Sequence, residues 1–265
     1  RGLTNLVNCK IDVVPDAKPV RKAPYRQSPE SRANMNTVIK QQLDLGIIEE
    51  ADEGTWSSPA MLVRKPNNRG FRLVVDYRGL NAVTIPQFLR IPRIDDVLDA
   101  VGESQPKYFT VLDCAQGFHQ IPLHPDSKDK TGFLTSSARY QYRTMPMGIK
   151  NAPMIFQSLM DKVLKGIQYK YVMAYIDDLC IYSPTFGSHL HHLETIFSKL
   201  REANIKLHPD KCKFAVSQVD FLGHVITSDG VKPDPQKVEA VKSFPVPSTL
   251  KQLRGFLGLS GYFRK

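Results

Sequence analysis

Apolar residues recur every three or four positions in several stretches of this chain, which is the spacing of an amphipathic helix. The clearest stretch begins at Ser28, a favourable helix N-cap followed by Pro29, and stops at Gly46. Its buried face would be formed by Met35, Val38, Ile39 and Leu43. The same pattern predicts helices over 94–101, over 151–167 after the cap Asn151, over 188–200 with Ser188 as cap, and over 235–244 and 248–262.

Shorter runs rich in β-branched and aromatic residues predict strands. They cover 59–65, 71–76, 109–113, 131–134, 140–144, 171–182, 213–216 and 218–226. From 109 to 216 the order is strand, helix, strand, strand, helix, strand, once the small hairpin at 131–144 is treated as an insertion. This order is the ferredoxin-like split βαβ pattern, so we expect an α+β fold.

The run at 171–182 carries Asp177 and Asp178 between two apolar halves, which predicts a hairpin with both acids at its tip. Asp is common in turns. Two-residue hairpin turns nevertheless favour Asn-Gly or Asp-Gly, because both central residues need a positive φ. Two adjacent carboxylates repel each other, and a bound divalent cation would offset that repulsion. We therefore interpret the pair as a metal site.

A third acid, Asp113, ends the strand at 109–113. A β-α-β connection within one sheet makes its two strands parallel. The strands that lead to Asp113 and Asp177 should therefore end at the same edge, with the second strand of the hairpin between them. Three carboxylates so placed would raise one another's pKa values. Two Mg²⁺ ions would relieve this repulsion, and the cluster predicts phosphoryl or nucleotidyl transfer.

The charge of the chain points to a polyanionic partner. It carries 36 Lys and Arg against 26 Asp and Glu, a net charge of +10, which favours nucleic acid. Arg64, Lys65, Arg69 and Arg72 gather around the tip of the 59–76 hairpin, which could fold over a triphosphate or simply be a solvated turn. Four cysteines without paired spacing indicate a reducing compartment and neither a disulfide framework nor zinc.

These residues together resemble the reverse transcriptases of retroviruses and long-terminal-repeat retrotransposons, most closely those of the gypsy class. The likeness is carried by LVVDYRGLN at 73–81, TVLD at 110–113, MPMGIKNAP at 145–153, YIDD at 175–178 and FLGH at 221–224. The motifs stand in the order of the family and cover nearly the whole chain.

The resemblance implies a polymerase right-hand fold with a ferredoxin-like palm, fingers and a partial helical thumb. We predict fingers over 1–85, palm over 86–118, a fingers insertion over 119–150, palm with the primer grip over 151–231, and the start of the thumb over 232–265. We also expect a piece of a larger Pol polyprotein with ribonuclease H, integrase and protease, since the chain begins at Arg1 and contains no complete thumb.

The resemblance also implies individual roles. Asp113, Asp177 and Asp178 would be catalytic and would hold two Mg²⁺ ions, which Mn²⁺ could replace, with the Cys114 carbonyl as a further ligand. The nucleotide would be bound by Lys65, Arg72, the backbone of Cys114, Ala115, Gln116 and Gly117, by Phe118 beside the sugar 2′ position, and by Met147. Leu222 and Gly223 would form the primer grip. Met147 stands where retroviral enzymes carry Gln, which removes a polar contact to the nucleotide.

The implied activity is that of an RNA-directed DNA polymerase that also copies DNA and extends a primer 3′ end. Its partners would be an RNA template, a DNA template and primer, and deoxyribonucleoside triphosphates. No apolar run is long enough to cross a bilayer, so we expect no membrane. The resemblance places the protein in the cytoplasm, within virus-like particles, with the nucleus as the alternative.

Two other functions remain open. An RNA-dependent RNA polymerase shares the palm. Such enzymes favour Gly before the Asp pair, where this chain has Ile176, and a small or polar residue near the sugar, where it has Phe118. A domesticated, inactive copy would only bind nucleic acid or partners, and the presence of all three acids argues against it. Primer extension on an RNA template, with wild type beside Asp177→Asn, separates these functions.

Overall fold

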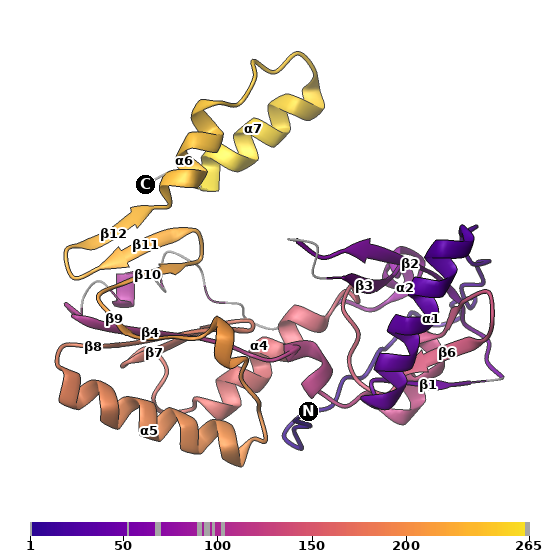
Figure 1. Ribbon diagram of the computed structural model, residues 1–265, viewed down its shortest axis with the longest axis horizontal. Helices are drawn as coiled ribbons and strands as arrows, with labels where there is room; N and C mark the ends of the chain where they lie inside the picture. The colour runs from indigo at the N-terminus through magenta and orange to yellow at the C-terminus, as the bar shows by residue number, and fades with distance from the viewer. Residues whose placement is uncertain are drawn as a thin grey trace.

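The structure is a computed structural model and describes residues 2–51, 53–66, 70–88, 92, 96, 99–101 and 104–262. Within this part of the chain the strands form three sheets, of five, four and three strands (Figure 1). The helix predicted over 94–101 and the basic residue Arg69 lie largely or wholly outside the described residues. None of the described helices is both long enough and apolar enough to span a bilayer.

The four-stranded sheet is built from the segment with the split βαβ pattern. Its strands are β4 (Tyr108–Asp113), β7 (Val172–Tyr175), β8 (Asp178–Ser183) and β9 (Lys213–Val216), in the order β7-β8-β4-β9. Helices α4 (Ala152–Val163) and α5 (Phe186–Glu202) provide the crossovers. All three pairings are antiparallel, so β4 and β7 run parallel with β8 between them. This topology confirms the predicted placement of the hairpin beside β4.

Alternating side chains give this sheet two different faces. Leu112 and Ile181 belong to the main core, which also contains the apolar side of α4 and α5. In Figure 1, α5 lies along this face. Phe109 and Tyr182 belong to a second cluster on the opposite face, together with Phe221. That cluster joins the sheet to the three-stranded sheet of β10 (Gln218–Phe221), β11 (His224–Thr227) and β12 (Gly230–Pro233).

The five-stranded sheet forms a separate layer at the right of Figure 1. Its order is β1 (Ile48–Glu50), β6 (Arg139–Tyr142), β5 (Phe133–Leu134), β2 (Ser58–Arg64) and β3 (Phe71–Val75). The long helix predicted from Ser28 is α1 (Pro29–Asp44). The Ser28 hydroxyl accepts from the backbone N–H of Ser31. Met35 and Ile39 are buried as predicted, whereas Val38 and Leu43 are only partly buried against the same core. A short helix that the sequence reading did not predict, α2 (Arg78–Val83), follows β3.

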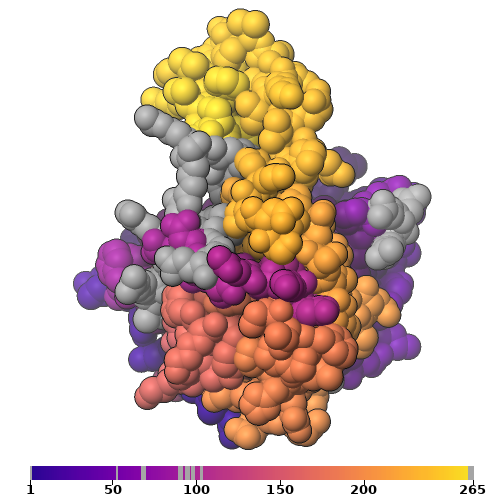
Figure 2. All heavy atoms as spheres, turned by 90° about the vertical axis from the view of Figure 1, so that its left-hand side faces the viewer, coloured from indigo at the N-terminus to yellow at the C-terminus, as the bar shows by residue number. Residues whose placement is uncertain are grey.

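The C-terminal segment carries the two predicted helices, α6 (Pro235–Lys242) and α7 (Leu250–Tyr262). They form a lobe that projects from the rest of the molecule, shown in yellow in Figures 1 and 2. Short 3-10 helices lie elsewhere, namely Gly117–Gln120, Pro125–Ser127, Asp129–Thr131 and Pro209–Lys211.

Three local predictions are wrong. Thr185, not Ser188, is the N-cap of α5, and Ser188 is the third helical residue of its capping box. Asn151 occupies the N-cap position of α4, but its side chain does not cap the helix: its Nδ2 donates to the Ile85 carbonyl and its Oδ1 accepts from the Gln87 N–H. The strand predicted over 218–226 is divided by a turn into β10 and β11.

Candidate active site

The predicted carboxylates meet at one edge of the four-stranded sheet. Asp113, the last residue of β4, is directly opposite Asp178, the first residue of β8. Tyr175, the last residue of β7, is also opposite Asp178, so Ile176 and Asp177 form a two-residue turn. The backbone therefore places the three acids together as the strand order predicts.

The turn contains a strained residue. Ile176 has a φ of 57°, a left-handed conformation that β-branched residues rarely adopt. Gln157, a fully buried residue of α4, compensates for this strain. Its Oε1 accepts from the Ile176 N–H at 2.8 Å, and its Nε2 donates to the Ala174 carbonyl at 3.2 Å and to Asp161 at 3.0 Å. Gln157 thus fixes the backbone that carries Asp177 and Asp178.

The acids interact electrostatically across this edge. Burial raises the pKa of the Asp178 carboxyl from its ordinary value of 3.8 to about 6, and the charges of Asp177 and Asp113 add to the effect. Burial, followed by the same charges, raises the pKa of the Cys114 thiol. Cys114 itself continues β4 into an isolated bridge with Leu207. The Asp178 carboxyl therefore experiences the charges of the other two acids.

Asp113 has a partner that the sequence reading missed. The Nζ of Lys211 lies 3.3 Å from Oδ1 and 3.2 Å from Oδ2 of Asp113. Lys211 ends a 3-10 helix, and this segment is anchored because the His208 N–H donates to the Asp113 carbonyl. A cluster of carboxylates is stabilised by a nearby positive charge, but the spacing of residues in the sequence does not indicate which lysine supplies it.

The site offers oxygen ligands of the type that Mg²⁺ prefers. Burial raises the pKa of Asp178 most, and the charges of Asp177 and Asp113 raise it further. A cation would offset those two charges, so the residues fit a divalent metal chemically. Among the described residues, however, no group of three or more His, Cys, Asp or Glu side chains converges closely enough to hold an ion. Asp113 pairs with Lys211 instead.

The backbone after Asp113 turns against the tip of the hairpin. Gln116 is left-handed, with a φ of 50°, and the Ala115 N–H donates to the Lys206 carbonyl. A Cβ on Gly117 would lie 3.3 Å from the Asp177 Cβ and 3.1 Å from a ring carbon of Phe156, so only glycine fits without displacement. The predicted nucleotide-binding backbone therefore lies directly beside a predicted metal ligand.

Phe118 is partly exposed at the end of this turn. Its ring meets the ring of Phe156 edge-on, with centroids 5.8 Å apart and an interplanar angle of 88°. Met147 lies in a neighbouring segment, because the Met145 N–H donates to the carbonyl of Ile121, three residues beyond Phe118. The side chain of Met147 is 40% exposed, so it is available to a ligand.

The two predicted triphosphate contacts lie on the β2–β3 hairpin. Lys65 and Arg72 are both exposed, and the Lys65 N–H closes the hairpin on the Gly70 carbonyl. Among the described residues, no hydrogen bond or ion pair joins either side chain to the three acids. The structure therefore leaves these two cations separate from the carboxylates.

The predicted primer grip is the turn between β10 and β11. Leu222 and Gly223 have φ values of 50° and 69°, the pattern of a type I′ hairpin turn between Phe221 and His224. The Asp234 N–H donates to the Gly223 carbonyl, which ties the turn to the start of α6. Leucine seldom adopts this conformation, which explains why the sequence reading continued the strand through it.

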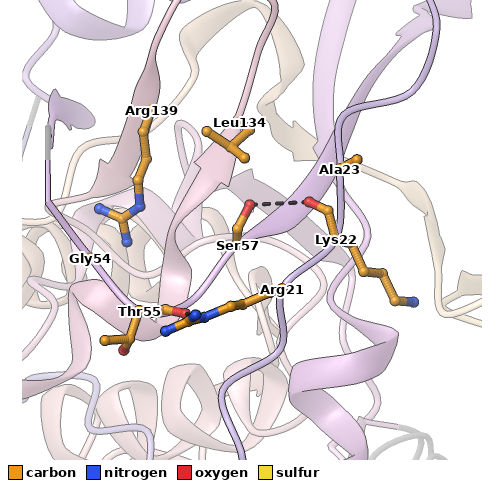
Figure 3. A pocket seen from close by; sticks show the side chains of 8 residues that line it. All are labelled: Arg21, Lys22, Ala23, Gly54, Thr55, Ser57, Leu134 and Arg139. Carbon is orange, nitrogen blue, oxygen red and sulfur yellow. Dashed lines mark hydrogen bonds between the residues drawn. The ribbon is translucent and has the colours of Figure 1, made fainter.

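A cavity of about 470 Å³ lies in the five-stranded layer, away from these residues (Figure 3). Its lining is Arg21, Lys22, Ala23, Gly54, Thr55, Ser57, Leu134 and Arg139, and it includes none of the predicted site residues. Arg139 is committed to the protein, since it donates to the Glu53 and Trp56 carbonyls and pairs with Asp129. The Lys22 side chain points away from Arg139 in Figure 3.

Comparison with known proteins gives concordant results. Residues 63–226 match the profile of a family described as reverse transcriptase (RNA-dependent DNA polymerase). The chain is 40% identical over 251 residues to the retrovirus-related Pol polyprotein from transposon 297 of Drosophila melanogaster, covering 93% of this chain and 23% of that polyprotein. It is 36% identical over 235 residues to the Pol polyprotein from transposon gypsy of the same organism, covering 87% and 22%.

Solved structures confirm the right-hand polymerase fold. The chain matches the foamy viral protease-reverse transcriptase dRH in complex with double-stranded DNA with a TM-score of 0.86, at 25% identity over 98% of this chain and 45% of that one. A second foamy viral protease-reverse transcriptase structure matches with a TM-score of 0.84 at 25% identity, over 99% and 54%. The chain spans under a quarter of the length of the two curated relatives.

Proposed function

Because this chain belongs to the reverse transcriptase (RNA-dependent DNA polymerase) family, we propose that it extends a primer 3′ end with deoxyribonucleotides by two-metal nucleotidyl transfer. It would copy RNA first and then DNA. The observation that carries the proposal is the register of the four-stranded sheet, which sets Asp113 opposite Asp178 with Asp177 in the adjoining turn.

The three acids would hold the metal ions. Two bound Mg²⁺ ions, or Mn²⁺ in their place, would activate the primer 3′ oxygen and stabilise the leaving diphosphate. Asp113, Asp177 and Asp178 would supply carboxylate ligands, and the Cys114 carbonyl a further oxygen. Gln157 would keep the Ile176–Asp177 turn in one conformation, since its amide bonds to the Ala174 carbonyl before the turn and to the N–H of Ile176, the first residue of the turn.

The nucleotide would lie between the palm and the β2–β3 hairpin. Lys65 and Arg72 would approach the triphosphate from the hairpin, where both are exposed. The backbone from Ala115 to Gly117 would face the phosphates or sugar, because it passes so near Asp177 that a Cβ on Gly117 would lie 3.3 Å from the Asp177 Cβ. Phe118 would fill the space at the sugar 2′ carbon, and Met147 would contact the nucleotide from the neighbouring segment.

The primer would rest on the three-stranded sheet. The Leu222–Gly223 turn is a closed two-residue hairpin, and the Asp234 N–H donates to its Gly223 carbonyl. Its backbone could therefore hold a primer strand against the sheet that carries the acids. We also propose that the chain acts with the ribonuclease H, integrase and protease parts of a Pol polyprotein, inside cytoplasmic particles.

Primer extension tests the proposal. Purified wild type should extend a DNA primer on an RNA template with deoxyribonucleotides and Mg²⁺, and Asp113→Asn, Asp177→Asn and Asp178→Asn should each lose at least roughly a hundredfold in kcat/KM. Asp44→Asn, an exposed position at the end of α1, is the matched control and should retain full activity.

The other functions are distinguishable outcomes of the same assay. Preference for ribonucleotides would indicate an RNA-dependent RNA polymerase. Nucleic-acid binding without extension would indicate an inactive copy. An acid-to-amide variant that kept the wild-type rate and Mg²⁺ dependence would remove that residue from the metal site.

A further inference from the structure

The side-chain amide of Asn81 joins two distant segments of the chain. Its Nδ2 donates to the Gly148 carbonyl at 2.8 Å, and its Oδ1 accepts from the Lys150 N–H at 2.7 Å. These partners lie 67 and 69 residues away in the sequence. One planar amide thus satisfies a carbonyl and an N–H on the same turn, a task that requires a donor and an acceptor on one short side chain.

The turn that Asn81 holds has little other support. Met147 and Gly148 are both exposed, whereas Met145 and Ile149 on either side are buried. Gly148 has a φ of 88°, so the chain reverses there in a conformation that glycine favours. Packing therefore anchors the two ends of the turn, and hydrogen bonds must fix its tip. A third hydrogen bond links the turn to the end of α2, since the Lys150 Nζ donates to the carbonyl of Thr84, the C-cap residue.

The segment that carries Asn81 is held to the five-stranded sheet by several hydrogen bonds. α2 starts directly after β3, the strand that carries Arg72. The Asp76 N–H donates to the Pro59 carbonyl on β2, and the buried Tyr77 hydroxyl donates to the Thr131 carbonyl. The Asn81 N–H in turn donates to the Tyr77 carbonyl. The amide of Asn81 therefore projects from a fixed base.

We propose that Asn81 is a positioning residue for nucleotide selection: it sets the place of Met147 relative to the hairpin that carries Lys65 and Arg72. This proposal rests on the proposed function, in which Met147 contacts the incoming nucleotide. Asn81 acts through the turn and touches no reacting group. Because the Met147 side chain has no hydrogen-bond donor and only a weak acceptor, its contribution to selectivity depends on where the backbone places it.

Two substitutions of Asn81 separate this role from general folding. Asn81→Ala removes both bonds to the turn. Asn81→Asp keeps the size of the side chain and the acceptor for Lys150, but it cannot donate to the Gly148 carbonyl. Asn36→Ala, an exposed asparagine on α1, is the control. Melting temperatures of all variants should stay close to wild type, since Asn81 is only half-buried.

The kinetic measurement is single-nucleotide extension at saturating primer–template. Both Asn81 variants should raise KM for the correct nucleotide by about tenfold while kcat changes by less than about threefold, and correct-to-incorrect selectivity should fall. Primer–template affinity should be unchanged, and Asn36→Ala should match wild type. Hydrogen exchange provides a readout that needs no activity: the Lys150 amide should exchange about tenfold faster in Asn81→Ala.

The outcomes differ for the two proposals. A wild-type protein that extends no primer overturns the proposed function, and with it this one. An active wild type whose Asn81 variants keep their KM and selectivity overturns only the positioning role. If the Asn81 variants lost affinity for primer–template but kept the nucleotide KM, the positioning role would also be overturned, because Asn81 would then be a nucleic-acid contact. Faster exchange at Lys150 together with the rise in KM supports it.

Discussion

Phe118 is the residue at which the choice of sugar should be tested. A rigid ring at the 2′ carbon leaves no room for a hydroxyl, and a clash of roughly 3 kcal/mol corresponds to a discrimination on the order of a hundredfold. Phe118→Val should therefore raise ribonucleotide incorporation strongly while costing less in deoxyribonucleotide use. The ratio of kcat/KM values for the two substrates is the measurement.

Phe186→Val, a half-exposed phenylalanine at the start of α5, is the control and should leave that ratio unchanged. If Phe118→Val left the ratio unchanged as well, another residue would guard the sugar, and Met147 would be the next to substitute.

Asp178 should make the stability of the metal-free protein depend on pH. Its pKa rises from 3.8 to about 6 on folding, so the folded state binds the proton more tightly. The stabilisation is complete below about pH 4 and is lost as the pH rises through about 6. Asp178→Asn should therefore stabilise the metal-free protein at pH 7 by about 1 kcal/mol, allowing for partial exposure, and change little at pH 4.

Urea unfolding in the presence of a chelator, at both pH values, measures this effect. Adding Mg²⁺ should stabilise wild type more than the variant, because protons and metal compete for the same carboxylates. If the free energy of unfolding depended on pH in the same way for both proteins, folding would not raise the pKa of Asp178.

Residues whose roles follow from backbone position were predictable from the sequence. Asp113 and Asp178 lie opposite each other because strand order and the handedness of crossovers fix which strand ends meet. Gln157 and Lys211 were not predictable, because their roles depend on side-chain contacts between segments far apart in the chain. A glutamine on the apolar face of a predicted helix was the available signal for Gln157.

At the scale of elements, the hairpin turn and α4 act as one unit through Gln157. Gln157→Leu keeps the approximate volume but leaves the Ile176 N–H without its acceptor. It should lower the free energy of unfolding by about 1–3 kcal/mol and kcat/KM by at least roughly tenfold. Chemical denaturation and primer extension measure the two effects.

Two comparisons make the Gln157 experiment specific. Gln157→Glu keeps an acceptor for the Ile176 N–H, but it cannot donate to the Ala174 carbonyl and sets a buried carboxylate against Asp161, so it should also lose activity. Gln41→Leu, on the exposed side of α1, should leave both quantities unchanged. A Gln157→Leu protein with wild-type kinetics would mean that the turn holds its conformation without the amide.

Helices with long amphipathic patterns were predicted close to their true bounds, as α1 and α7 show. α2 was missed because it has only six residues, which include Gly79, and its stability comes from contacts with other segments. The turn after β10 was missed because Leu222 adopts a conformation that its residue type disfavours. The local sequence pattern does not predict the backbone conformation where contacts with distant segments determine it.

For the whole molecule, the net charge of +10 should make nucleic-acid binding strongly salt-dependent. Phosphate contacts release counterions, so the dissociation constant should rise by at least about a hundredfold between about 50 and 200 mM salt. Lys251 and Arg254 are exposed on α7, whereas Arg264 and Lys265, expected to contribute, lie outside the described residues. The double change Lys251→Gln with Arg254→Gln should reduce the salt slope.

A fluorescence anisotropy titration across salt concentrations measures that slope. Lys40→Gln, an exposed change on α1, is the control for the loss of charge alone. A dissociation constant that did not respond to salt would contradict binding through phosphates in this lobe.

The register of β4 against β8 also determines how copies of this gene can decay. Successive residues of a strand face opposite sides, so inserting one codon within β8 would exchange the side chains that it presents to the main core and to the second cluster, and would shift Asp178 away from Asp113. The same insertion between β11 and β12, where Ser228 and Asp229 form an exposed turn, alters no pairing around the acids. Among inherited copies, length changes should therefore accumulate in that turn, and a single codon gained in β8 should mark a lineage that no longer multiplies.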